Sequence, residues 1–247
     1  MVDLYQKGEV PEEYRLEVLE TIATKGGASD LSMLYSMALD QEMENEHRLD
    51  HLGALEEAFR QRKIKPDRDL HRLEELLLSD DESIRISAIR LMGHWDQEEQ
   101  TDRLVKMAQQ GPETVSRAAL GALASMSNTK SQNWVAEMTG KNYSPALRQQ
   151  ALFQLVSLNS SKAAELTREW LIDLPTGMDA SILFSAFLPT KKGTGALAGA
   201  LSDVPIPEPL AKIGRQVIQQ ELPYYRNQEA EVSQLKKVLE ASGGVLP

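Results

Sequence analysis

A pattern of apolar residues recurs in this chain at an interval of 31 or 32 residues. Each copy has the spacing of one buried face of an α-helix, with a small residue between the apolar ones. The three clearest copies are Ile84-Arg85-x-x-Ala88-Ile89-x-x-Met92, Val115-Ser116-x-x-Ala119-Leu120-x-x-Leu123 and Leu147-Arg148-x-x-Ala151-Leu152-x-x-Leu155. A generic helical bundle needs no fixed interval between helices, so the interval favours a stack of repeated helical units.

Looser copies of the pattern extend the array in both directions. Residues 178–186 place Ile182 at the small-residue position, and residues 210–218 place Gly214 there, followed by the polar Arg215. Towards the N-terminus, Leu49 and Tyr14 occupy the phase of Ile84, about 35 residues apart. A small side chain at this position is expected because stacked helices need a close backbone approach where they cross.

A second helix is expected to follow each patterned helix. The predicted second helices are residues 30–39, 70–78, 101–109, 131–138, 162–171, 195–201 and 231–240. Each pair alone leaves an apolar face uncovered, so stability must come from stacking neighbours. The sequence therefore predicts an all-α fold, an α-solenoid of about seven antiparallel HEAT-like helix pairs. We expect one domain over residues 1–247, forming a continuous right-handed superhelix.

Proline, glycine and serine residues mark the expected helix ends. Pro11 should open the first patterned helix and Gly26-Gly27 should end it, with Ser29 capping the next. Ser144-Pro145 has the cap and first-position residues of another helix. The basic stretch 59–69 is expected to form an extended loop between helices.

Charge and composition exclude several classes of function. The chain has a formal net charge of −10, and residues 1–60 contain 14 Asp and Glu against five Lys and Arg. Such a chain lacks the basic footprint that nucleic acids and anionic membranes require. Cysteine is absent, which excludes disulfides, thiolate metal sites and covalent haem attachment in this sequence. Residues 1–10 are polar and do not resemble a signal peptide.

His47 and His51 have the i, i+4 spacing of some metal ligands. They lie four positions apart on an expected helix, which can direct two imidazoles to one ion. However, no Glu stands between them as in an H-E-x-x-H motif, and the segment is polar and acidic. A solvated helix face is the preferred interpretation. His71 and His94 are expected to be packed or exposed individually.

Other candidate motifs also favour structural interpretations. The carboxylate pairs, such as Glu56-Glu57, should point apart, and Asp80-Asp81-Glu82 should cap a helix start. Residues 190–195 combine Gly and Lys but lack the order of a phosphate-binding P-loop, so a solvated loop is expected. The three tryptophans, Trp95, Trp134 and Trp170, should fill gaps between layers. We therefore predict no catalytic, cofactor-binding or metal-binding residues and no cofactor.

Several longer phrases carry a family resemblance. They are residues 26–31 (GGASDL), 64–70 (IKPDRDL), 83–91 (SIRISAIRL), 187–193 (FLPTKKG) with 196–198 (ALA), and 241–244 (ASGG). Together they resemble the HEAT-repeat region of large bacterial putative membrane-bound dehydrogenases, also described as PVC-type haem-binding proteins. In that family a sugar-dehydrogenase-like β-propeller precedes the helical region, and a c-type cytochrome domain with a C-x-x-C-H motif follows it.

The resemblance implies a role without chemistry of its own. The family's propeller and haem segments lie outside this sequence, so no catalytic residues carry over. We expect a non-catalytic scaffold and protein-interaction domain, a spacer between the propeller and cytochrome domains of one chain, in an extracytoplasmic or periplasmic setting. Its partners would be those flanking domains, with no nucleic acid and no direct membrane insertion. Two alternatives remain: a free-standing cytosolic HEAT-repeat adaptor, and a HEAT-like DNA glycosylase, which would need a basic concave face.

Overall fold

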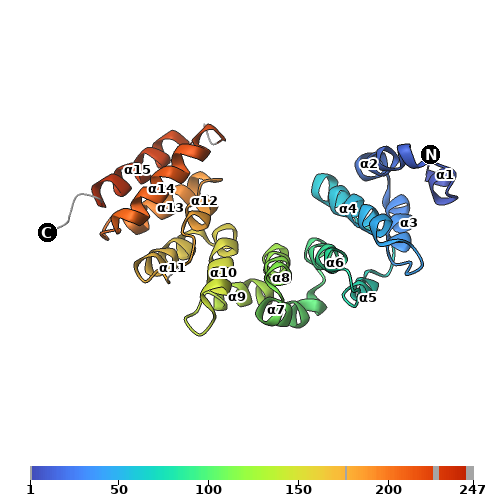
Figure 1. Ribbon diagram of the computed structural model, residues 1–247, viewed down its shortest axis with the longest axis horizontal. Helices are drawn as coiled ribbons and strands as arrows, with labels where there is room; N and C mark the ends of the chain where they lie inside the picture. The colour runs from blue at the N-terminus through green and yellow to red at the C-terminus, as the bar shows by residue number, and fades with distance from the viewer. Residues whose placement is uncertain (1, 176, 225–227, 243–247) are drawn as a thin grey trace. The chain divides into compact units, whose positions relative to one another are not determined.

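The computed structural model describes residues 2–175, 177–224 and 228–242, and these residues contain helices and no β-strand (Figure 1). Gly243 and Gly244, which belong to the segment 241–244 of the family resemblance, lie outside the described residues. The chain divides into two compact units, Met1–Ser131 and Gln132–Pro247. We call these the N-terminal unit and the C-terminal unit. The described helices form an α-solenoid, as the interval predicted. That all pairs form one continuous superhelix stays a prediction.

The N-terminal unit contains two layers of helices. Its bounds are α1 (Val2–Gln6), η1 (Glu12–Tyr14), α2 (Arg15–Lys25), α3 (Ala28–Ala38), α4 (Asn45–Arg62), η2 (Leu70–Arg72), α5 (Leu73–Leu76), α6 (Glu82–His94), η3 (Glu98–Gln100), α7 (Thr101–Gln110) and α8 (Glu113–Ser125). The first helices of successive pairs, α2, α4, α6 and α8, pack one on the next. The second helices, α3, α5 and α7, follow them in the chain (Figure 1).

The C-terminal unit repeats this plan. Helix α9 (Thr129–Glu137) crosses the boundary between the units, and the unit continues with α10 (Pro145–Leu158), α11 (Ser160–Ile172), α12 (Ser181–Phe187), α13 (Lys191–Leu201), α14 (Glu208–Glu221), η4 (Leu222–Tyr224) and α15 (Glu229–Ser242). Helices α10, α12 and α14 pack in one row, and α11, α13 and α15 in the other. Buried leucines, alanines and the rings of Phe184, Phe187 and Trp170 fill the space between them.

One polar contact fixes the register of the repeats. Arg48, Arg85 and Arg148 each donate to a backbone oxygen at, or up to three residues beyond, the end of the preceding second helix. The acceptors are Ala38 (3.0 Å), Ser79 (2.6 Å) and Thr139 (3.3 Å) respectively. Ser116 does the same to Ala108. The three arginines place a positive charge near the negative C-terminal end of the preceding second helix, which is favourable. The donor is the second residue of the apolar pattern in each of the three clearest repeats, namely Arg85, Ser116 and Arg148.

The register corrects two expected positions. Three residues beyond each contact stand Ala88, Ala119 and Ala151, all fully buried, but three residues beyond Arg48 stands His51. His47 rather than Leu49 therefore corresponds to Ile84. Tyr14, expected in the same phase, is 52% exposed at the start of α2.

In the C-terminal unit, Ile182 was expected at the small-residue position, but it is 43% exposed, whereas Leu183 is fully buried. Leu183, which lies 32 residues after Ala151, is the buried counterpart of Ala151. The pattern in this repeat is therefore displaced by one residue from the position expected. Gly214 does occupy its expected position. A Cβ atom on it would lie 2.9 Å from side-chain atoms of Phe184 and Leu239, so the helices approach closely at this glycine.

Several expected helix ends also shift. Helix α4 continues to Arg62 and ends at Lys63 in the left-handed region (φ 58°), so the loop spans 63–69 rather than 59–69. Gly27, not Ser29, is the N-cap of α3, and its N–H donates to Asp30. Residues 191–195, expected as a loop, form the first turn of α13, since Thr190 accepts a hydrogen bond from Gly193 N–H at 3.0 Å. Ser144 caps α10 with Pro145 at its first turn, as predicted.

Candidate interaction surface

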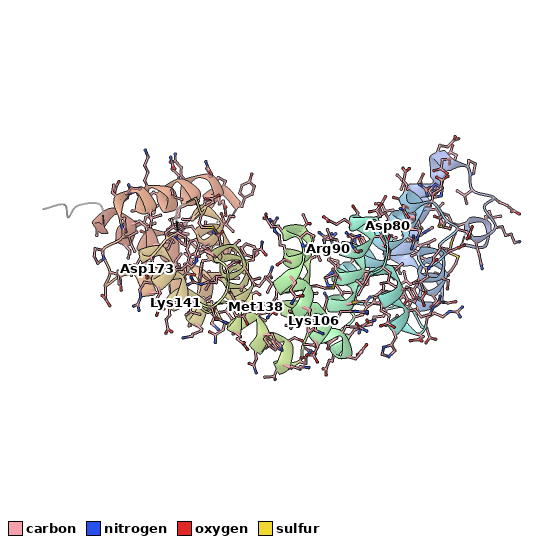
Figure 2. The ribbon with its side chains drawn as sticks, turned by 60° about the horizontal axis from the view of Figure 1, so that its bottom comes forward. Asp80, Arg90, Lys106, Met138, Lys141 and Asp173 are labelled. Atoms are coloured by element: carbon pink, nitrogen blue, oxygen red, sulfur yellow. The ribbon has the colours of Figure 1, made fainter. Side chains whose placement is uncertain are left out.

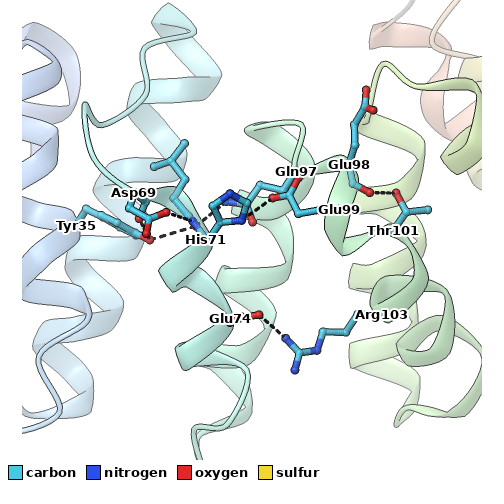
Figure 3. Close-up of polar contacts among 10 residues, drawn as sticks. Tyr35, Asp69, His71, Glu74, Gln97, Glu98, Glu99, Thr101 and Arg103 are labelled. Carbon is cyan, nitrogen blue, oxygen red and sulfur yellow. Dashed lines mark hydrogen bonds and ion pairs between the residues drawn. The ribbon is translucent and has the colours of Figure 1, made fainter.

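The segment around Leu70 joins three repeats through polar contacts (Figure 3). The Tyr35 hydroxyl donates to the carbonyl oxygens of Asp69 (3.2 Å) and Leu70 (3.3 Å). From the other side, the amide of Gln97 donates to the same Leu70 oxygen at 2.7 Å. Gln97 is buried, and Tyr35 packs edge-on against Trp95 with ring centroids 5.6 Å apart. These groups hold neighbouring repeats together.

Charges on the second-helix layer pair between repeats. Glu74 of α5 lies 3.1 Å from Arg103 of α7 (Figure 3), and Asp102 lies 2.7 Å from Lys130. His71 faces Glu99 at 3.1 Å. Exposed pairs of this kind contribute at most about 1 kcal/mol each. Their lysine and arginine groups already face carboxylates, which disfavours the duplex-gripping surface that a glycosylase would need.

The basic residues near the 63–69 loop cap helix ends, a role that the sequence analysis missed. Arg62 donates to the carbonyls of Gly26 (2.7 Å) and Ala23 (2.8 Å) at the C-terminus of α2. Lys65 donates to the Trp95 carbonyl at 2.6 Å, at the end of α6. The sequence feature that could have indicated this role is the concentration of positive charge in residues 59–69, because cations are stabilised near the negative C-terminal end of a helix.

The two histidines with metal-ligand spacing point to different partners. His51 is buried, and its Nε2 lies 2.8 Å from the Tyr5 hydroxyl. His47 Nε2 lies 3.8 Å from a carboxylate oxygen of Glu12. In the part of the chain that the structure describes, His, Asp and Glu side chains do not gather in groups of three that could hold a metal ion. Burial, followed by the charges of Arg15 and His47, lowers the pKa of His51 to about 4.

The carboxylate pairs occupy separate environments. Glu56 is directed towards Ser87 and Arg90, and burial raises its pKa. Its neighbour Glu57 bonds to Arg60, which lowers the Glu57 pKa. The two therefore point apart, as predicted. Asp81 accepts from the N–H of Ser83 (2.8 Å) and Ile84 (3.4 Å), so its role at the start of α6 is capping.

The remaining candidate residues are two histidines and three tryptophans. His71 is exposed, and His94 stacks on Phe59 with ring centroids 5.3 Å apart. Burial lowers the pKa of His94. Trp95 and Trp170 are buried between helices, as expected for gap-filling side chains, and Trp134 is partly buried. None of the described helices has the length and hydrophobicity that a membrane crossing requires.

Exposed carboxylates form two groups in the N-terminal unit. The first lies on residues 9–20, along the connection into α2 and on α2 itself, where Leu16 is also 62% exposed. Glu12 in this group pairs with Arg15 at 2.9 Å. The second group occupies residues 40–46, in the connection between α3 and α4 and the first turn of α4. Its members are Asp40, Glu42, Glu44 and Glu46, all exposed.

Two hollows flank this second group. One, of about 550 Å³, lies over α3 and reaches Asp40; we call it the Met33 hollow. The other, of about 350 Å³, is lined by Gln41, Asn45, Leu78 and Asp80, among others; we call it the Leu78 hollow. Leu78 is 80% exposed, and Figure 2 labels Asp80 on the surface of this unit. Acidic residues 40–46 therefore border two recesses with partly apolar linings.

Comparison with known families identifies the class of the central segment. Residues 70–156 match the family model described as HEAT repeats. That segment runs from η2 into α10 and contains the three clearest copies of the sequence pattern. The described residues thus form a helical-repeat protein in which residues 70–156 are similar to HEAT repeats, and HEAT repeats commonly mediate protein–protein interactions. No curated protein sequence matches the chain significantly.

Proposed function

We propose that this chain is a non-catalytic scaffold that holds other protein domains at a fixed distance and angle. The α-solenoid fold carries the proposal, because each repeat packs on its neighbours and the array resists bending within a unit. The polar contacts at Leu70 and the helix-capping cations support it by tying successive repeats together.

The resemblance described above suggests which domains the scaffold separates. They are a β-propeller oxidoreductase domain and an electron-accepting c-type cytochrome domain of the same polypeptide, in an extracytoplasmic setting. The acidic N-terminal unit would orient a basic partner surface through long-range attraction. The nine carboxylates invoked are exposed, which supports this role. They are Glu9, Glu12, Glu13, Glu17, Glu20, Asp40, Glu42, Glu44 and Glu46.

The first test is the sequence of the complete gene product. A signal peptide before this segment and a C-x-x-C-H motif after it support the spacer role. A gene product with neither would favour the cytosolic adaptor.

The second test measures association between this segment and the flanking domains supplied separately. We expect binding that weakens as salt rises, since exposed charges are screened at about 10 Å in 0.1 M salt. Replacing Asp40, Glu42, Glu44 and Glu46 by Lys should weaken it further. A matched control replaces four exposed acids of the C-terminal unit, namely Glu169, Asp173, Asp203 and Glu229. Equal weakening by both sets would show that net charge, not this surface, drives binding.

A further inference from the structure

The Met33 hollow is formed by three elements of the N-terminal unit. Helix α3 supplies Met33, Ser36 and Met37, α1 supplies Gln6, and the 63–69 loop supplies Arg68. Its volume of about 550 Å³ is in the range of recesses that bind ligands. The hollow therefore offers space for side chains of another molecule.

Hydrogen bonds hold one wall of the hollow in place. The buried Ser32 hydroxyl donates to the Ala28 carbonyl at 2.7 Å and accepts from the Asp67 N–H at 2.8 Å. These two hydrogen bonds, one within α3 and one to the loop, hold the 63–69 segment beside the helix. The hollow is thus shaped before any partner arrives, which reduces the entropy lost on binding.

Two apolar side chains at helical spacing lie on the surface of the hollow, among polar ones such as Gln6 and Ser29. Met33 and Met37 are partly exposed and lie four residues apart, so they share one face of α3. Methionine is flexible and polarizable, and methionine-rich surfaces adapt to varied apolar partners. The serine hydroxyl beside them, on Ser36, is already used in a bond to the Ser32 carbonyl.

The charge at the rim is predominantly negative. Asp40 and Asp67 line the hollow with a single cation, Arg68. The chain continues from Asp40 into Glu42 and Glu44, and the Glu42 N–H bonds to the Asp40 carboxylate at 3.0 Å. Gln41 and Asn45, which follow Asp40 in the chain, line the Leu78 hollow together with the exposed Leu78 and Asp80. The acidic residues Asp40, Glu42 and Glu44 therefore lie in a segment that contributes to the lining of both hollows.

We infer that the Met33 hollow binds a basic amphipathic helix of a partner protein. Its apolar side chains enter the hollow over Met33 and Met37, and its lysines or arginines face Asp40, Glu42 and Glu44. Helix-in-groove recognition combines apolar contacts, here those offered by Met33 and Met37, with complementary charges. Nucleic acids and anionic lipids are disfavoured because their phosphates would face the same carboxylates. The inference rests on the proposed function as an interaction scaffold and names the chemistry of its partner.

The test uses a synthetic peptide of leucine and lysine, about 14 residues long, with all leucines on one helical face. A second peptide has the same composition in scrambled order. Binding to the whole chain is measured by calorimetry at two salt concentrations. We expect the amphipathic peptide to bind at least about tenfold more tightly than the scrambled one. Equal binding of both peptides would overturn the inference, because net charge alone would explain it.

Two pairs of variants locate the site. Ser36→Trp fills the hollow without changing charge and should weaken binding about tenfold or more. Its control, Gln110→Trp, adds the same ring at an exposed site on α7 and should leave binding unchanged. The triple variant Asp40→Asn, Glu42→Gln, Glu44→Gln should weaken binding and reduce its salt dependence. The control triple variant, Glu13→Gln, Glu17→Gln, Glu20→Gln, removes the same charge from η1 and α2, and we call it the α2 variant. Thermal melts confirm that each variant folds.

Each outcome has a defined meaning. Unchanged peptide binding in Ser36→Trp, or a larger effect of the α2 variant, would place the peptide elsewhere and overturn the inference. Association with the flanking domains is a separate measurement. If it persists while the amphipathic peptide fails to bind the hollow, the partner inference is wrong and the scaffold role stands. If the flanking domains do not associate but the peptide binds the hollow, the spacer role is wrong and the hollow remains a helix-binding site.

Discussion

Tyr5 and His51 meet in the interior of the N-terminal unit, with the Tyr5 hydroxyl 2.8 Å from His51 Nε2 and the two rings edge to face at 86°. His51 occupies the position that Ala88, Ala119 and Ala151 fill in the following repeats. An imidazole is too large for a close helix crossing, and here α1 covers it. Tyr5 is 6% exposed, and burial raises its pKa to about 12. The contact fastens α1 to the first repeats.

The first prediction concerns acid stability. The folded-state pKa of His51, about 4, lies below the ordinary value of 6.5, so the unfolded chain binds the proton first. The contribution of His51 to the free energy of unfolding is therefore fully present above pH 6.5 and is lost as the pH drops towards 4. The loss attributable to His51 is about 3 kcal/mol. Urea titrations of the free energy of unfolding at pH 7, 5.5 and 4 measure it.

Substitutions on α4 isolate this effect. His51→Gln keeps an acceptor for Tyr5 but cannot titrate, so its stability should vary less between pH 6.5 and 4. The charged groups around His51 are Arg15 and Asp50, joined at 2.7 Å, together with His47 and Glu12. Glu56 lies further along α4, and its raised pKa has the opposite effect on pH dependence. The comparison is therefore repeated in a Glu56→Gln background. An unchanged slope in His51→Gln would refute the assignment.

The second prediction concerns Gly93 of α6. A Cβ atom there would lie 2.5 Å from the Cα and 2.8 Å from the carbonyl oxygen of Ala122 in α8. Backbone atoms cannot move aside as a side chain can, so Gly93→Ala should destabilise the chain by about 3 kcal/mol. Gly53→Ala is the matched control, because nothing lies within 4 Å of its Cβ position on α4. That substitution should stabilise by up to about 1 kcal/mol through helix propensity. Thermal denaturation followed by circular dichroism distinguishes the two.

The third prediction compares two neighbouring arginines. Arg62 donates to backbone oxygens at the end of α2, whereas the exposed Arg60 pairs with the partly exposed Glu57. Arg62→Met removes several charge-assisted bonds between repeats and should cost about 2 kcal/mol. Arg60→Met should cost under about 0.5 kcal/mol. Chemical denaturation measures both, and equal losses would show that the Arg62 contacts add nothing to stability.

The fourth prediction separates two adjacent aspartates. Asp81 caps α6 through the N–H groups of Ser83 and Ile84, while the exposed Asp80 side chain does not cap this helix. Asp81→Ala should destabilise by about 1 kcal/mol. Asp80→Ala should have little effect on stability. Because the two substitutions change net charge equally, a difference between their melting temperatures reports the cap alone.

The fold class could be predicted from the sequence because the repeat is visible in the local spacing of apolar and small residues. Ala88, Ala119 and Ala151 mark one helix face in three consecutive units, and this face is the buried one. The outer repeats were harder to align. At His51 a large residue replaces the small one, and at Ile182 the pattern is displaced by one position, so local spacing no longer identifies the buried face.

The surface features could not be predicted to the same degree. Arg62 reaches carbonyls 36 to 40 residues earlier in the chain, and no sequence period reports such a contact. The Met33 hollow joins α1, α3 and the 63–69 loop, whose proximity depends on how the first repeats pack. The acidic residues were visible in the sequence, but the recesses beside them were not.

The contacts between repeats have a consequence for synthesis on the ribosome. The hydrogen bond between Gln97 and Leu70 joins residues 27 positions apart, that between Tyr5 and His51 joins residues 46 apart, and the Tyr35–Trp95 ring contact joins residues 60 apart. Each newly emerged helix pair can therefore close its bonds with the pair made just before it. Proteins with such short-range contacts fold rapidly, and the N-terminal part of a chain folds first during translation. Tyr5 must wait for His51, so α1 should be the last element of the first repeats to dock, after α4 has left the exit tunnel.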